Sequence, residues 1–199
     1  MSLDNIKKYF EVRRFAMDED DYSKLMGLVD ALGEGLDKKE ADSNVLKDEG
    51  DKLVENGKLF DGLDKYQNGL EICPLNKLIL LHRAGVYGQI SKKLKNCDNC
   101  ICGDKPKEEA KKFEYKSFYD LVEDKKLCYH QKVNLFNKCA INDSIRGLHV
   151  DPFDARFYVK LIEIHEDDSK AQEYYLREGL RIAPENDELM KLKEIILKE

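Results

Sequence analysis

A group of cysteines near the middle of the chain contains the residues best suited to bind a metal ion. Cys97, Cys100 and Cys102 form a C-x2-C-x-C pattern, and Cys128 and His130 follow downstream. Thiolates at this spacing can share one tetrahedral zinc ion, with Cys128 or His130 as the fourth ligand. A structural zinc is the one cofactor that the sequence suggests, and no cofactor is required. The alternative is a polar loop with reduced cysteines, because the chain has no second C-x2-C pair.

No residue pattern in the sequence indicates an enzyme. The histidines show no nucleophile–base spacing, and there is no glycine-rich phosphate loop. A thiol oxidoreductase would carry its C-x-x-C motif at a helix N-terminus within a strand-containing unit, whereas here the motif follows a predicted helix. We therefore expect a binding protein rather than a catalyst.

The composition predicts an all-α cytoplasmic protein. Of the 199 residues, 37% are charged and 42% are hydrophobic. The chain has no alternating apolar run long enough for a sheet and no apolar stretch of 18 residues that could span a membrane. Residues 1–10 are too polar for a secretory segment. The formal net charge of −6 disfavours nucleic acid, so we expect neither nucleic acid nor a membrane as a partner.

Three segments share the pattern Gly-Leu-x-[Ile/Val]-x-Pro, which is the main structural signal in the chain. They are residues 69–74 (GLEICP), 147–152 (GLHVDP) and 179–184 (GLRIAP). The glycine allows two helices to approach closely, and the proline ends the second helix because it has no N–H to donate. A repeated helix ending predicts an array of helical hairpins that bury their core between neighbours.

The first repeat, read back from its proline, resembles the tetratricopeptide repeat (TPR) of roughly 34 residues. The matching large, small, aromatic and proline positions are Leu46, Gly50, Leu53, Gly62, Tyr66, Gly69 and Pro74. The resemblance implies TPR hairpins arranged in a right-handed superhelix. Pro152 lies 78 residues after Pro74, so the second repeat must contain an insertion, predicted at about residues 94–135.

These spacings predict the organisation of the whole chain. Residues 1–42 are expected to form N-terminal helices, one of them over residues 20–36, and residues 43–199 a three-repeat TPR domain. The helix pairs are expected at about 43–74, at 77–94 joined to 136–152, and at 153–184. Asn186 is well placed to cap a final helix, whose apolar face would seal the open end of the array.

The opening of the first repeat, LKDEGDKL at residues 46–53, is similar to that of co-chaperone TPR domains. The preceding stretch, residues 28–46, resembles the leader of the cyclophilin-seven-suppressor type of co-chaperone. Such domains bind the C-terminal Glu-Glu-Val-Asp tail of cytosolic heat-shock chaperones in a groove lined by the first helices of the repeats. The resemblance therefore implies a co-chaperone adaptor whose partner is that acidic tail peptide.

The resemblance assigns five positions to the peptide-binding site: Lys47, Asp51, His82, Arg156 and Lys160. Three cations converging on a groove could bind two carboxylates through charge-assisted hydrogen bonds. The family has asparagine at the positions of Asp51 and His82. Ionised Asp51 cannot donate a hydrogen bond, so we expect it either to repel an acidic tail or to pair with Lys47 or Lys52. This departure keeps open a second hypothesis, a generic assembly scaffold that binds a non-chaperone peptide and carries a zinc-binding insertion.

Overall fold

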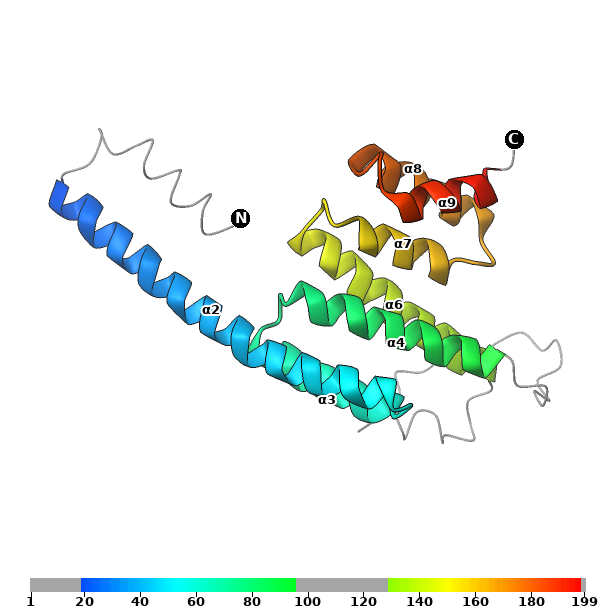
Figure 1. The fold of residues 1–199 in the computed structure, drawn as a ribbon, viewed down its shortest axis with the longest axis horizontal. Helices are drawn as coiled ribbons and strands as arrows, with labels where there is room; N and C mark the ends of the chain where they lie inside the picture. Colours follow the sequence, from blue (N-terminus) through cyan, green and yellow to red (C-terminus); the bar gives the residue numbers. More distant parts are fainter. Residues whose placement is uncertain (1–18, 96–128, 198–199) are drawn as a thin grey trace.

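The computed structural model describes residues 19–95 and 129–197, and all regular structure within these two ranges is α-helical. The helices are α2 (Glu19–Glu55), α3 (Leu59–Ile72), α4 (Lys77–Lys95), α6 (Tyr129–Val150), α7 (Ala155–Ile164), α8 (Ser169–Ile182) and α9 (Asp187–Ile196). They pack in chain order, with α4 beside α6 and with α7, α8 and α9 stacked beyond them (Figure 1). The all-α prediction is confirmed.

The three repeated segments end their helices in the same way. In α3, α6 and α8, the first residue after the helix donates its backbone N–H to the carbonyl of the repeated glycine, at 2.9, 2.8 and 2.8 Å. The three pairs are Cys73 to Gly69, Asp151 to Gly147 and Ala183 to Gly179. The proline that follows has no N–H, so the helix cannot continue. The predicted helix endings are confirmed.

A polar residue two positions after each proline begins the next helix. Asn76 accepts hydrogen bonds from the backbone N–H groups of Leu78 and Ile79 at 3.1 and 3.2 Å. Asp154 and Asn186 accept corresponding bonds at the starts of α7 and α9. Side-chain acceptors satisfy N–H groups that a helix start leaves unpaired. The repeated pattern therefore includes this cap, which we had predicted only for Asn186.

The repeated glycines lie where helices approach closely, as predicted. Gly69, Gly147 and Gly179 are all buried. A Cβ atom on Gly69 would lie 2.5 Å from the Ile79 side chain, and one on Gly147 would overlap the Phe157 ring. Any larger residue at these positions would therefore push neighbouring helices apart.

Two glycines shape the first hairpin, Gly57 in the turn between α2 and α3 and Gly50 within α2. Gly57 has a φ of +78°, which side chains rarely adopt. Its N–H donates to Val54, and the N–H of Lys58 donates to Leu53, both at 2.9 Å, which satisfies the last carbonyls of α2. A Cβ atom on Gly50 would lie 2.6 Å from the Tyr66 ring, so the glycine makes room for that ring.

Residues 20–36 are helical as expected, but the expected end of that helix at residue 36 is wrong, because α2 runs without a break from Glu19 to Glu55. Nothing in residues 36–46 stops a helix: there is no proline, and Gly57 is the one residue in the described ranges with positive φ. The first half of α2 extends away from the other described helices (Figure 1). The predicted boundary after residue 42 falls inside this helix, and the division into two units stays a prediction.

The second hairpin is formed by α4 and α6, which lie on either side of the predicted insertion. The insertion predicted at about 94–135 overlaps both helices, because α4 extends to Lys95 and α6 begins at Tyr129. Residues 96–128 lie outside the described residues. Arg83 of α4 and Asp143 of α6 form a buried ion pair, with nitrogen–oxygen distances of 2.7 and 2.8 Å. This pair joins the two helices within their buried interface.

Two hydrophobic clusters form the core of the described residues. The first joins α3, α4 and α6, and its largest fully buried members include Leu63, Tyr66, Ile79, Leu80 and Phe136. The second joins α7, α8 and α9 around Leu176 and Leu189. Burial of Leu189 shows that α9 covers the last hairpin, as expected for a capping helix. In the described ranges, no helix has the length and apolarity needed to cross a membrane.

Candidate functional site

A groove opens on the surface formed by α2, α4 and α7. Each of these helices is the first of a packed pair, and the pairs are α2–α3, α4–α6 and α7–α8. The first hollow of the groove has a volume of about 420 Å³ and an apolar lining from Val54, Leu81 and Val86. The polar side chains that line the same hollow are Asp51, Glu55, Tyr66, His82, Gln89 and Lys160. Three of the predicted site residues therefore share this hollow, namely Asp51, His82 and Lys160.

Asp51 is the centre of a hydrogen-bond network in the groove. Its Oδ2 accepts from the Lys47 ammonium at 2.8 Å. Its Oδ1 accepts from the Tyr66 hydroxyl at 2.5 Å and lies 2.7 Å from Nδ1 of His82. Because an ionised carboxylate only accepts hydrogen bonds, His82 carries a proton on Nδ1. Of the alternatives left open for Asp51, the structure shows the pairing with Lys47.

The pKa values in this network keep both members of the Lys47–Asp51 pair charged at neutral pH. Burial acts to raise the pKa of Asp51, but hydrogen bonds from Lys47, Tyr66 and His82 outweigh it and lower the pKa. Burial likewise acts to lower the pKa of Lys47, but its bonds to Asp48 and Asp51 raise it. The Lys47 side chain is only 13% exposed and has two carboxylate partners, at 2.7 and 2.8 Å. Much of its charge is therefore neutralised within the protein.

The other two predicted cations lie on α7, but only one of them lines the groove. Arg156 donates to both carboxylate oxygens of Asp154, at 2.8 and 2.6 Å, and does not line the first hollow. Lys160 lines the groove, where its ammonium donates to Glu163 at 2.7 Å. Within the described residues, Lys47, Arg156 and Lys160 each have a carboxylate partner and do not converge on one hollow.

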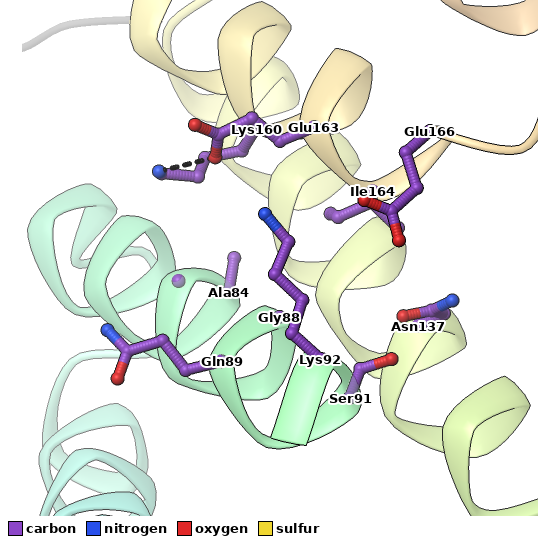
Figure 2. A pocket seen from close by; sticks show the side chains of 11 residues that line it. Ala84, Gly88, Gln89, Ser91, Lys92, Asn137, Lys160, Glu163, Ile164 and Glu166 are labelled. Carbon is purple, nitrogen blue, oxygen red and sulfur yellow. Dashed lines mark hydrogen bonds and ion pairs between the residues drawn. The ribbon is translucent and has the colours of Figure 1, made fainter. Parts of the chain in front are cut away.

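A second hollow of about 130 Å³ adjoins the first between α4, α6 and α7 (Figure 2). The two hollows share Gly85, Gln89 and Lys160. The remaining residues that line the second hollow are Ala84, Gly88, Ser91, Lys92, Asn137, Glu163, Ile164 and Glu166. Figure 2 shows the Lys92 side chain reaching from α4 into this space, with Lys160 and Glu163 of α7 across from it.

Solved structures match this chain, although no family model and no curated protein matches its sequence. The TPR domain of Arabidopsis OM64 matches with a TM-score of 0.53 and 12% identity, over 81% of this chain and 98% of its own. Two further matches each have a TM-score of 0.52 and 15% identity, over 78% of this chain and 90% of theirs. They are the first TPR of Spaghetti (RPAP3) bound to the HSP90 peptide SRMEEVD, and the first TPR domain of human RPAP3.

The chain has the tetratricopeptide-repeat fold. In residues 19–95 and 129–197 the TPR hairpins are α2–α3, α4–α6 and α7–α8, and α9 packs against the last of them. At 12–15% identity the likeness fixes the fold alone. The resemblance to the cyclophilin-seven-suppressor type and the roles of the five predicted residues stay predictions.

The sequence did not identify Lys92 as a TPR groove residue. Lys92, Lys93 and Lys95 close α4, where basic residues favour the negative end of the helix dipole. That pattern predicts solvated surface charge and gives no sign of a site. Only the packing of α6 and α7 against α4 shows that Lys92, and not Lys93, lines a hollow.

Two glycines of α4 leave bare backbone in the groove. A Cβ atom on Gly85 or on Gly88 would meet no atom within 4 Å. Helix packing therefore does not require either glycine, unlike Gly69 or Gly147. Each costs about 1 kcal/mol of helix propensity relative to alanine. Their effect in the folded chain is to leave open space above α4.

The predicted zinc site is not tested by the described residues. Cys97, Cys100, Cys102 and Cys128 lie outside them, and His130 is an exposed residue of α6. In residues 19–95 and 129–197, no group of three or more His, Cys, Asp or Glu side chains could hold a metal ion. Zinc binding by the insertion stays a prediction.

Proposed function

We propose that the TPR groove binds an extended peptide, and that this chain is a co-chaperone adaptor for the C-terminal tail of a cytosolic heat-shock chaperone. The first hollow carries the proposal, because its apolar lining lies beside the side chain of Lys160. An apolar side chain can fill such a hollow while a neighbouring carboxylate meets a cation. The peptide SRMEEVD, bound to the Spaghetti TPR, ends in a valine followed by an aspartate and has this chemistry.

The adaptor proposal agrees with the hydrogen bonds among the side chains of the groove. In the first hollow, the Asp51 carboxylate, the Tyr66 hydroxyl and the His82 ring bind one another. We propose that the chain acts by binding alone. A cytosolic chaperone as partner would also place the protein in the cytoplasm.

A peptide titration tests the proposed function directly. We expect SRMEEVD to bind the full chain with a Kd in the micromolar range, about −8 kcal/mol, by isothermal titration calorimetry. The same peptide amidated at its C-terminus should bind more weakly, because it loses one charge-assisted hydrogen bond. Raising the salt concentration should weaken binding of the acid form more than that of the amide, since salt screens charge–charge attraction.

Two results of this titration would contradict the chaperone-tail proposal. Absence of binding would exclude the tail as a ligand of this groove. Equal binding of the acid and the amide would show that no cation recognises the terminal carboxylate, which favours the second candidate, a scaffold for a non-chaperone peptide. Asp51 and Glu55 are the observation that supports this candidate, because both put negative charge on the α2 side of the first hollow.

A further inference from the structure

We infer that Lys92 is the residue that recognises the peptide's carboxylate, at a subsite in the second hollow between α4 and α7. The inference rests on the proposed function and assigns the acid-recognising charge to a residue outside the predicted set. The ligand group is a carboxylate at the end of an extended peptide.

The charges of the groove single out Lys92. In the described part of the chain, Lys160 and His82 line the groove but are already paired with Glu163 and Asp51. Lys92 lines the second hollow with no ion-pair partner among the described residues. The acidic residues of this hollow are also paired, since Glu163 binds Lys160 and Glu166 binds Lys95. A carboxylate that enters the hollow therefore meets one uncompensated positive charge.

The space around Lys92 suits a small anionic group. The hollow of about 130 Å³ has room for a carboxylate with a short side chain, but not for a length of peptide. Gly88 contributes no side chain to its lining, and Asn137 brings an amide that can donate a hydrogen bond. Lys160 lies across the hollow from Lys92 and adds a second ammonium at its edge (Figure 2).

The two hollows together match the chemistry of an acidic peptide end. They share Gly85, Gln89 and Lys160, so the end of a peptide in the first hollow lies beside the second. An apolar side chain among Val54, Leu81 and Val86 would then precede the carboxylate at Lys92 along the peptide. The Gly85 backbone, which has open space above it, lies where the peptide must pass.

Paired charge-neutralising variants test the inference. Lys92→Gln and Lys93→Gln each remove one positive charge from neighbouring exposed positions of α4, but only Lys92 lines the hollow. Loss of one charged hydrogen bond predicts that Lys92→Gln weakens binding of SRMEEVD about tenfold. Lys93→Gln should stay within about twofold of the wild type, because an exposed charge outside the site acts only through screened attraction. Lys92→Gln should also bind the acid and the amidated peptide equally.

Other outcomes of this experiment separate failure of the Lys92 subsite from failure of the proposed function. Equal weakening by the two variants would show a general charge effect and overturn the Lys92 subsite, while leaving the proposed function in place. The same holds if Lys92→Gln keeps the wild-type preference for the acid, or if Lys47→Gln abolishes that preference instead. If the wild-type chain binds neither peptide, the proposed function and the subsite both fail. Circular dichroism should show unchanged helix content in both variants, because both side chains are exposed.

Discussion

At the scale of single residues, Asp51 determines the chemistry of the groove. A family pattern with asparagine at this position makes an aspartate look like a repulsive substitution. In the structure the carboxylate instead accepts from Lys47, Tyr66 and His82, which come from three different helices. The sequence offered pairing with Lys47 as one of its alternatives, and residues four apart share one helix face. It could not predict the contacts with Tyr66 and His82, which are 15 and 31 residues away and depend on how the hairpins pack.

Asp51 should therefore stabilise the fold. Replacing Asp51 with Asn removes the charged acceptor from three donors, so we expect a loss of about 1–3 kcal/mol in the free energy of unfolding at pH 7. Because the folded-state pKa of Asp51 is lowered, its contribution is present at neutral pH. The contribution is lost as the pH falls through that lowered pKa. Urea denaturation of wild type and variant at a series of pH values should show the two converging in acid.

Asp48→Asn is the matched control for this prediction. Asp48 also binds Lys47, but its side chain is 65% exposed. Its replacement should change stability by no more than about 0.5 kcal/mol. If Asp51→Asn were equally mild, or if its effect persisted unchanged at low pH, the Asp51 network would not contribute as described.

At the scale of helices, the sequence predicted where a helix ends better than it predicted whether a helix continues. The Gly-Leu-x-[Ile/Val]-x-Pro segments end α3, α6 and α8 because proline removes a donor wherever it occurs, whatever the packing. The continuity of α2 was missed, since a repeat pattern indicates where a unit begins but not whether the preceding helix stops. Lys92 was missed for a related reason: a lysine near a helix end gives no signal until other helices form a hollow around it.

Two substitutions of Gly85 test its effects on stability and on peptide binding separately. Gly85→Ala should raise the free energy of unfolding by about 0.5–1 kcal/mol, because alanine favours a helix and its Cβ would meet no neighbour. Gly85→Leu places a larger side chain where the two hollows meet, so it should abolish peptide binding while the helix stays intact. Thermal denaturation and peptide titration of both variants check this. Unchanged peptide affinity in Gly85→Leu would show that the peptide does not pass over α4.

At the scale of the whole molecule, the TPR array must stay in register across the residues between α4 and α6. The buried pair of Arg83 and Asp143 joins α4 to α6, and Arg83 also donates to Gln67 of α3 at 2.6 Å and so contacts both neighbouring helices. Its guanidinium further lies 5.7 Å from the centre of the Tyr87 ring. The Asp143 side chain is only 1% exposed, so neither charge has bulk water as an alternative partner.

Breaking this pair should be one of the most damaging single changes in the chain. Asp143→Ala leaves the Arg83 charge buried without its carboxylate, and we expect a loss of about 3–5 kcal/mol in the free energy of unfolding. Glu49→Ala breaks an exposed ion pair with Lys65 and should cost no more than about 1 kcal/mol. Urea denaturation measures both.

A double variant separates the loss of the pair from damage to the core. Arg83→Met combined with Asp143→Leu removes both buried charges and keeps apolar volume at the contact between α4 and α6. It should recover much of the stability that Asp143→Ala loses, because an apolar pair avoids the cost of removing charges from water. If the double variant is stable but binds no peptide, the pair is needed to hold α6 and α7 where they form the second hollow. If Asp143→Ala costs no more than Glu49→Ala, the register of the array is set by the hydrophobic core alone.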